Sequence, residues 1–152
     1  MAITINHQTN DISATSGSIT IDGASAGGAS SNVGTGNFIG GTNAGAALQS
    51  GAQDNTLLGH EAGNDITTGD GNVAVGLSSL EKGTSSSYNT AVGAYAQRYQ
   101  TGDNNVSLGN GALSGSLGSS SASFNVAVGN GSGRYVTTGN SNTFLGYNSG
   151  NS

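Results

Sequence analysis

Short alternating runs of apolar and small residues recur along most of this chain, each opened by asparagine and closed by glycine. In the run Asn89-Thr90-Ala91-Val92-Gly93, Thr90 and Val92 share one strand face and Ala91 points to the other, because residues two apart lie on the same side of an extended strand. The run therefore predicts a three-residue strand that ends at a glycine. Glycine at that place permits a positive φ or a close backbone contact without steric cost.

The same pattern occurs seven times, at steps of 16 to 20 residues. The asparagines are Asn37, Asn55, Asn72, Asn89, Asn105, Asn125 and Asn142. The matching glycines are Gly41, Gly59, Gly76, Gly93, Gly109, Gly129 and Gly146. A small residue follows each glycine three places later: Ala44, Ala62, Ser79, Ala96, Ala112, Ser132 and Ser149. A fixed period of this length is typical of stacked coils, and the asparagine column is expected to stack amide on amide.

The middle residues of four central strands are small, and this suggests how copies of the chain meet. They are Ala74, Ala91, Ser107 and Ala127. A single stack of coils with such small side chains buries little apolar surface by itself. We therefore expect these four residues to form the face along which three copies pack around a three-fold axis, giving a homotrimer.

The repeats predict an all-β fold, a parallel β-roll or β-solenoid of about seven coils over residues 37–152, assembled side by side as a homotrimer. Residues 1–22 lie outside the repeat. Ile3 and Ile5, and then Ile19 and Ile21, alternate with threonine there, which predicts a short N-terminal strand region. Two strands alone are marginal in water, so this region is expected to attach to another protein or to copies of itself. Residues 23–36 are rich in Gly, Ala and Ser and indicate a linker.

Composition favours a thin coil stack over a bulky globular domain. The 152 residues include 28 Gly and no Pro, Cys or Trp, and only 33% are hydrophobic. Charged residues make up 7%, which is too few for the usual disordered signature. The net charge is −5, with Lys82, Arg98 and Arg134 as the permanent cations, so a basic nucleic-acid footprint is excluded. No apolar run reaches membrane-spanning length, and the opening residues lack the pattern of a signal peptide.

Candidate chemistry is sparse. His7 and His60 stand in unrelated contexts, and nothing in the pattern brings a nucleophile and a base together. Residues 63–72 resemble a calcium-binding nonapeptide repeat only faintly, because Asp65 and Asp70 do not recur in the other coils. Asn, Asp and Gly at these places are better explained as turn residues. We therefore expect no enzyme activity, no metal and no cofactor.

Two Arg-Tyr pairs occupy matching places in their repeats. They are Arg98-Tyr99 and Arg134-Tyr135, and with Tyr95 they carry much of the aromatic surface. One interpretation is contact with a glycan, since aromatic rings stack on sugar rings. The other is packing between protomers, where Tyr and Arg are also enriched.

The repeat Asn-Thr-Ala-Val-Gly-x-x-Ala, followed over residues 37–150, resembles the head repeats of trimeric autotransporter adhesins. It is more closely similar to repeats of bacteriophage tail-fibre and other virion-fibre proteins. The resemblance implies a left-handed parallel β-roll with three chains side by side. Three departures stand out: these coils are longer than the adhesin repeat, Gly40 stands where an aliphatic residue is expected, and no chaperone domain or membrane anchor follows. A chain that starts at Met1 without an anchor favours a virion protein over an adhesin.

The resulting functional prediction is a structural virion protein of a tailed phage, made in the host cytoplasm. It would form a trimeric fibre or fibre connector on tail or capsid and aid host attachment. Its partners would be copies of itself and other virion proteins, contacted through residues 1–22 and through the C-terminal end. One alternative is an adhesin that binds a cell-surface glycan or protein. Another is an ice-binding β-solenoid, which requires a regular Thr-x-Thr column that these repeats lack.

Overall fold

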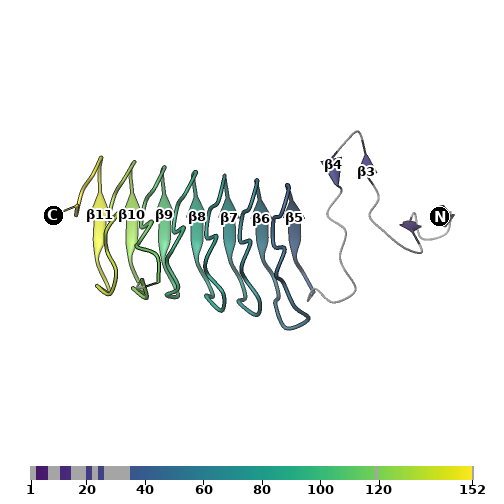
Figure 1. Ribbon diagram of the computed structural model, residues 1–152, viewed down its shortest axis with the longest axis horizontal. Helices are drawn as coiled ribbons and strands as arrows, with labels where there is room; N and C mark the ends of the chain where they lie inside the picture. The colour runs from purple at the N-terminus through teal and green to yellow at the C-terminus, as the bar shows by residue number, and fades with distance from the viewer. Residues whose placement is uncertain are drawn as a thin grey trace.

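Seven short parallel strands form one continuous sheet along the repeat region (Figure 1). The computed structural model of the protein describes residues 3–6, 11–14, 20–21, 24–25, 35–118 and 120–151. The strands of the sheet are β5 (Phe38–Gly40), β6 (Thr56–Leu58), β7 (Val73–Val75), β8 (Thr90–Val92), β9 (Val106–Leu108), β10 (Val126–Val128) and β11 (Thr143–Leu145). Each pairs in parallel with its neighbours in sequence, so the chain winds through about six turns of a β-solenoid. The predicted all-β stack of parallel coils is confirmed.

Equivalent residues of successive coils lie directly above one another. We number the coils 1 to 7 by the asparagine that opens each, from Asn37 to Asn142. Neighbouring strands pair without a shift, so that Ala91 lies between Ala74 and Ser107. Each column of the sequence pattern is therefore a column in space.

The middle residue of each inner strand points into its own coil. The side chains of Leu57, Ala74, Ala91, Ser107 and Ala127 are all fully buried within the single chain. The alanines pack there with the small residue that follows each glycine, such as Ala96. The prediction that Ala74, Ala91, Ser107 and Ala127 form an interface between copies is therefore wrong. Each coil closes on itself, and this closure leaves those side chains no surface to offer to another chain.

The asparagine column is a continuous ladder of amides inside the solenoid. The Oδ1 atom of Asn89 accepts two hydrogen bonds from Asn105, one from its backbone N–H at 2.9 Å and one from its Nδ2 at 3.2 Å. The Nδ2 group of Asn89 donates to Asn72 Oδ1 and, across its own coil, to the carbonyl of Gly102 at 3.0 Å. The backbone-to-Oδ1 bond recurs at all six steps of the column with lengths of 2.9–3.0 Å. Each inner asparagine thus joins neighbouring coils and also closes its own.

A second ladder of hydrogen bonds lies two residues before each asparagine. Its bonds run in the opposite direction, because the backbone N–H of each coil donates to a side chain of the next coil. The backbone N–H of Ser87 donates to Asp103 Oδ1 at 2.8 Å, and the N–H of Asp103 donates to Ser123 Oγ at 3.0 Å. The full column is Gln53, Asp70, Ser87, Asp103, Ser123 and Asn140. Side chains with a short oxygen acceptor fill it, because the backbone N–H of the preceding coil needs a partner there. This column was missed by the sequence analysis.

The conserved spacing of the glycines has two physical causes at each step of the column. Gly93 has a φ of +130°, in a region that side-chain-bearing residues rarely adopt. A Cβ atom at that position would lie 2.6 Å from the carbonyl oxygen of Gly109 in the next coil. The coils therefore approach one another along a strip of bare backbone.

Large side chains in the core alternate between two places three residues apart. In coil 2 the first place is Gly63 and the second is the buried Ile66. In coil 3 the order is reversed: the first place is the buried Leu80 and the second is Gly83. A Cβ on Gly63 would lie 2.9 Å from Ile66, and one on Gly83 would lie 3.0 Å from Leu80. In coils 2 and 3, one of these two places holds a bulky residue, and the glycine at the other place leaves room for it.

Coil 4 interrupts the apolar interior with a polar layer. Gln97 and Gln100 are both fully buried and stand where most other coils carry an aliphatic residue or glycine. Gln97 Nε2 donates to Ser107 Oγ at 3.0 Å, and Gln100 Oε1 accepts from the backbone of Ala122 at 2.9 Å. The buried apolar residues accordingly fall into two clusters, one in coils 1–4 and one in coils 5 and 6.

The described N-terminal residues form two antiparallel strand pairs. β1 (Ile3–Asn6) pairs with β2 (Asp11–Ala14), and β3 (Thr20–Ile21) pairs with β4 (Ala24–Ser25). The expected strands at Ile3 and Ile21 are present, while His7 and Ile19 lie outside the described residues. β4 falls inside the segment 23–36 that was expected to be a linker.

Helix is absent from the described residues, which therefore contain no helix long and apolar enough to cross a membrane. Residues 77–82, with the sequence Leu-Ser-Ser-Leu-Glu-Lys, form no helical turn either. Ser78 and Leu80 both have a φ of +49°, which a right-handed helix does not accommodate.

The glycine column predicts that a glycine-to-alanine change destabilises the fold strongly inside the column and little outside it. Replacing Gly93 by alanine should lower the free energy of unfolding by about 2–4 kcal/mol, because the methyl group adds both a strained φ and a backbone clash. Gly51→Ala is the matched control, since Gly51 is exposed and a Cβ there meets nothing closer than 3.8 Å. Urea denaturation of both variants measures the difference. Equal stabilities would contradict the close approach of the coils.

The amide ladder predicts that replacing an inner asparagine destabilises the fold more than replacing the last one. Asn89→Ala removes an acceptor from two donors of Asn105 and a donor from the Gly102 carbonyl, so it should destabilise the fold by about 2–4 kcal/mol. Asn142→Ala should cost about 1 kcal/mol or less, because Asn142 is half-buried and, among the described residues, accepts from no further asparagine. Thermal unfolding followed by circular dichroism compares the two. A larger loss at Asn142 would refute the ladder's role.

Candidate functional site

The two Arg-Tyr pairs lie on the flank of the solenoid that follows the strands. Arg98 and Tyr99 come nine and ten residues after the asparagine of coil 4, and Arg134 and Tyr135 hold the same places in coil 6. Because the coils stack in register, both pairs fall in the same two columns, two coils apart. Coil 5 lies between them and carries Ser114 and Gly115 at these places.

A hollow of about 280 Å³ opens between the two pairs. Tyr95, Arg98 and Tyr99 of coil 4 line one side, and Arg134 of coil 6 lines the other. The remaining lining residues belong to coil 5: Asn110, Gly111 and Ser114. The small residues of coil 5 leave the hollow open, and its walls come from the large residues of the coils on either side.

Arg98 is held in place by aromatic rings and by a carboxylate. Its guanidinium carbon lies 5.2 Å from the ring centre of Tyr95 and 4.9 Å from that of Tyr99. Its Nε donates to Glu81 Oε2 at 2.7 Å. Cation–π contacts with two rings and a charge-assisted hydrogen bond together fix the orientation of the side chain.

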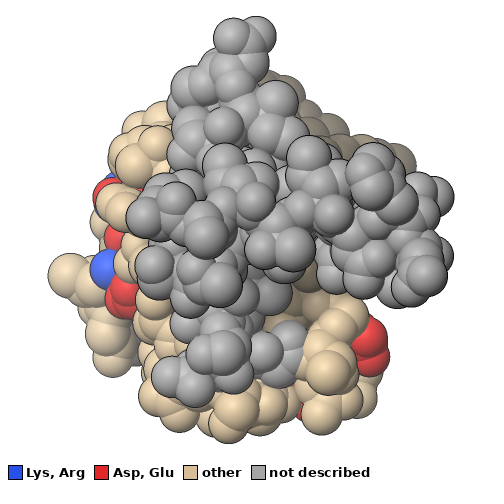
Figure 2. Space-filling model, turned by 90° about the vertical axis from the view of Figure 1, so that its right-hand side faces the viewer, with Lys and Arg blue, Asp and Glu red and all other residues tan. Residues whose placement is uncertain are grey.

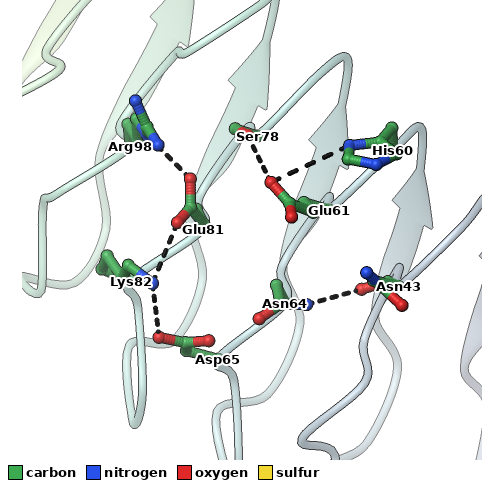
Figure 3. A network of polar contacts seen from close by, with 9 residues as sticks. All are labelled: Asn43, His60, Glu61, Asn64, Asp65, Ser78, Glu81, Lys82 and Arg98. Atoms are coloured by element: carbon green, nitrogen blue, oxygen red, sulfur yellow. Dashed lines mark hydrogen bonds and ion pairs between the residues drawn. The ribbon is translucent and has the colours of Figure 1, made fainter.

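Glu81 is the centre of an ion-pair network that joins coils 2, 3 and 4 (Figure 3). It contacts Arg98 on one side and Lys82 at 2.9 Å on the other, and Lys82 contacts Asp65 at 2.9 Å. Glu61, nearby on the same flank, accepts a hydrogen bond from Ser78 at 3.2 Å and lies 3.8 Å from His60. Figure 2 shows acidic and basic atoms next to one another on this flank.

Burial and pairing act in opposite directions on Glu81, whose residue is only 6% exposed. Burial by itself raises the pKa of its carboxyl, but the hydrogen bonds from Lys82 and Arg98, with their positive charges, outweigh burial and hold the pKa below 4.5. The hydrogen bond to Glu81 is also the main cause that raises the pKa of Lys82 and of Arg98. Glu81, Lys82 and Arg98 are therefore charged at neutral pH.

Arg134 differs from Arg98 in having no carboxylate partner among the described residues. Its side chain is exposed and lies over Tyr135, with 6.0 Å between the guanidinium carbon and the ring centre. The Asp65–Lys82–Glu81–Arg98 network is neutral in sum. Arg134 therefore gives the hollow a net positive charge in a chain whose overall charge is −5.

A second hollow, of about 420 Å³, adjoins the first through Tyr99, which lines both. Its other walls come from coils 2 to 5, with two charged residues of the ion-pair network first: Asp65, Lys82, Thr84, Thr101, Leu117, Gly118, Ser120 and Ser121. The last four come from coil 5, whose connection to the next coil is the longest because the step from Gly109 to Gly129 spans 20 residues. That connection is anchored by a parallel bridge between Ser120 and Gln100.

The structure brings together four of the five predicted surface residues. Tyr95, Arg98, Tyr99 and Arg134 share one hollow, and Tyr135 lies beside it under Arg134. The five inner asparagines of the repeat are fully buried, and each repeat glycine except Gly146 lies against the backbone of the next coil. The contribution of coil 5 was missed, although aligning the repeats already shows that its residues are small between two Arg-Tyr pairs.

Residues 63–72, which faintly resemble a calcium-binding repeat, do not bring their two aspartates together as metal ligands. Asp65 pairs with Lys82, whereas Asp70 accepts the backbone N–H of Gln53 in the second ladder. Within the described part of the chain, no group of three His, Asp or Glu side chains gathers as metal ligands would.

Comparisons of the chain with protein-family models, with curated proteins and with solved structures return no match.

The network around Glu81 predicts a pH-dependent contribution to stability. A lowered pKa means that the contribution is complete above about pH 4.5 and is lost as the pH falls through the lower pKa of the folded state. Glu81→Gln should therefore destabilise the protein by about 1.5–3 kcal/mol at pH 7, and the difference from the unchanged protein should vanish in acid. Chemical denaturation at several pH values measures this.

Glu61→Gln is the matched control, because no Lys or Arg contacts Glu61 in the described residues. It should change stability by less than about 1 kcal/mol at any pH. A Glu81→Gln effect that stays constant from neutral to acidic pH would show that packing, rather than charge, explains it.

Proposed function

We infer a function from the outer face of the seven-strand sheet, which is largely apolar and is uncovered in the single chain. The first and third residues of each strand point outward in two columns. The first column holds Phe38, Thr56, Val73, Thr90, Val106, Val126 and Thr143, and the other holds Gly40, Leu58, Val75, Val92, Leu108, Val128 and Leu145. Phe38, Leu108 and Leu145 are 64%, 48% and 76% exposed. Contiguous apolar surface of this kind marks a site of protein–protein contact.

We propose that the chain is a non-catalytic structural subunit of a fibre, which assembles with copies of itself through this outer sheet face. The observation that carries the proposal is this face itself, which is largely apolar, extends over seven strands and is left uncovered by the described residues. Three copies would each contribute one such face to a common axis, which closes the assembly without leaving an apolar face exposed. The side chains at the interface are thus the outward ones, not the inward Ala74, Ala91, Ser107 and Ala127.

The assignment to a virion rests on the resemblance of the repeats to phage fibre proteins. A stack of coils tied together by backbone and amide hydrogen bonds is stiff along its axis, as a tail or capsid fibre requires. An antibody against the protein, applied to purified particles and viewed by electron microscopy, tests this assignment. Labelling of the particle body or tail supports it, and absence of the protein from complete particles contradicts it.

A second candidate function is adhesion to a cell-surface glycan, favoured by the hollow that Tyr95, Tyr99, Arg98 and Arg134 line. It is compatible with the first, because the hollow lies on the flank after the strands rather than on the outer sheet face. Ice binding is not favoured: Thr56 and Thr90 share their column with Val73, so no regular rank of threonines forms.

Assembly through the outer sheet face predicts the effect of a charge placed there. The unchanged protein should have the mass of about three chains in light scattering coupled to size exclusion. Leu108→Lys should give single folded chains, because an unpaired charge buried at the interface costs about 3 kcal/mol or more. Ser50→Lys, at an exposed position outside the sheet, is the control and should stay trimeric.

Circular dichroism verifies that both variants keep the fold. A stable monomer for the unchanged protein, or a trimeric Leu108→Lys variant, would contradict the proposed interface. Ala91→Arg is not informative, since it would disrupt the interior of each chain whether or not chains assemble.

A further inference from the structure

The flank with the two Arg-Tyr pairs combines features that no other described part of the chain combines. It has a hollow, two guanidinium groups and stacked aromatic rings. Elsewhere among the described residues, exposed aromatic side chains such as Tyr88 and Phe124 stand at turns before the asparagines, with no Lys or Arg over their rings. A ligand for this flank is therefore expected to be both anionic and ring-shaped.

The spacing of the coils sets the size of that ligand. Stacked parallel strands repeat at about 4.8 Å, so equivalent residues of coils 4 and 6 start about 10 Å apart. Arg98 and Arg134 thus flank a space about one sugar ring wide, over the small residues Gly111 and Ser114. Gly111 forms part of the floor, and a Cβ on it would lie in van der Waals contact with the guanidinium of Arg134, at 3.9 Å.

The charges favour a carboxylate in this space. Among the described residues, the hydrogen bonds of the Arg98 guanidinium involve only Nε, and Arg134 has no carboxylate partner. Guanidinium groups bind carboxylates through paired N–H donors in one plane, so two of them on opposite walls can hold one acidic group. Asn110 and Ser114 add neutral hydrogen-bonding groups of the kind that contact sugar hydroxyls.

The second hollow extends the site beyond one ring. Tyr99 lines both hollows, and the second is walled by hydroxyls of Thr84, Thr101 and Ser120 with the apolar Leu117. Hydroxyl and small residues around an aromatic ring suit a neutral sugar better than a second anion, because Lys82 on that wall is already paired with Asp65 and Glu81. The two hollows together accommodate an acidic unit followed by a neutral one.

We propose that this flank binds an acidic oligosaccharide. The carboxylate of one sugar lies between Arg98 and Arg134, its ring packs against Tyr95 and Tyr99, and the adjoining neutral sugar occupies the second hollow. The assignment rests on the second proposed function, contact with a glycan, and names its ligand class. Fibre assembly does not depend on it, because the outer sheet face and this flank are different surfaces.

Isothermal titration calorimetry of the full chain tests the proposal with three probes. The first two are a hyaluronan tetrasaccharide, which alternates carboxylate and neutral sugars, and sialyllactose. The third is the same tetrasaccharide with its carboxyl groups reduced to alcohols. We expect at least one acidic probe to bind and the reduced tetrasaccharide to bind about 10- to 100-fold more weakly, as loss of a charge-assisted contact implies.

Three variants locate the site. Arg134→Gln should lower the affinity for the acidic probe by about 10- to 100-fold. The affinity of Arg134→Lys should lie between those of Arg134→Gln and the unchanged protein, because lysine keeps the charge but not the planar guanidinium. Neither should alter the fold, since Arg134 is exposed and in no ion pair with the described residues. Tyr88→Asn is the matched control: Tyr88 is exposed, lines neither hollow, and shares its column with Asn104. It should leave affinity unchanged.

Each contrary result has a distinct meaning. Equal binding of the acidic and reduced tetrasaccharides keeps the glycan function but overturns the acidic assignment. Inorganic phosphate is titrated as a further control, and an affinity for it equal to that for the acidic saccharides overturns the saccharide in favour of a simple anion site. Binding of none of the probes, or binding unaffected by Arg134→Gln, overturns the site. Light scattering on the same samples reports assembly separately, so failure of this site is distinguishable from failure of the fibre proposal.

Discussion

The hydrogen bond from the backbone of each opening asparagine to the amide oxygen of the asparagine before it is the contact on which the solenoid depends. With few apolar residues, the chain has no bulky core to hold its coils together. The amide ladder replaces much of that core, because every inner asparagine satisfies its own buried polar atoms while it joins two coils and closes one. The glycine column completes the arrangement, since bare backbone at Gly93 and its equivalents lets the coils approach closely enough for those bonds.

Once these columns determine the interior, the outside of the coils is free to vary. The outer sheet face keeps β-branched and apolar residues, which suits contact with other copies of the chain. The flank after the strands instead differs from coil to coil: coils 2 and 3 carry acidic and basic partners, coils 4 and 6 carry Arg-Tyr pairs, and coil 5 carries small residues. Local variation on a regular scaffold produces the hollow, and the ion pair between Glu81 and Arg98 keeps one of its walls in place.

The repeats in the sequence allowed much of this architecture to be predicted. A strand of three residues, a turn at Gly93 and the stacking of Asn89 on its equivalents follow from local geometry, since a period-two pattern bounded by Asn and Gly has few other solutions. The matching places of Arg98 and Arg134 in their repeats likewise indicated that they share a flank. The direction in which Ala91 points was predicted wrongly, because small residues on one strand face are consistent either with a closed coil or with an interface.

The sequence by itself therefore determined the number of coils, their register and the residues of each column, because these properties depend on spacing alone. Only the tertiary structure decided which column faces inward. That choice depends on how each coil closes, through bonds such as Asn89 to Gly102 that span the coil interior and have no local signature. The hollow between Arg98 and Arg134 is also a tertiary property, since it exists only where a coil with Gly111 and Ser114 lies between two coils with large side chains.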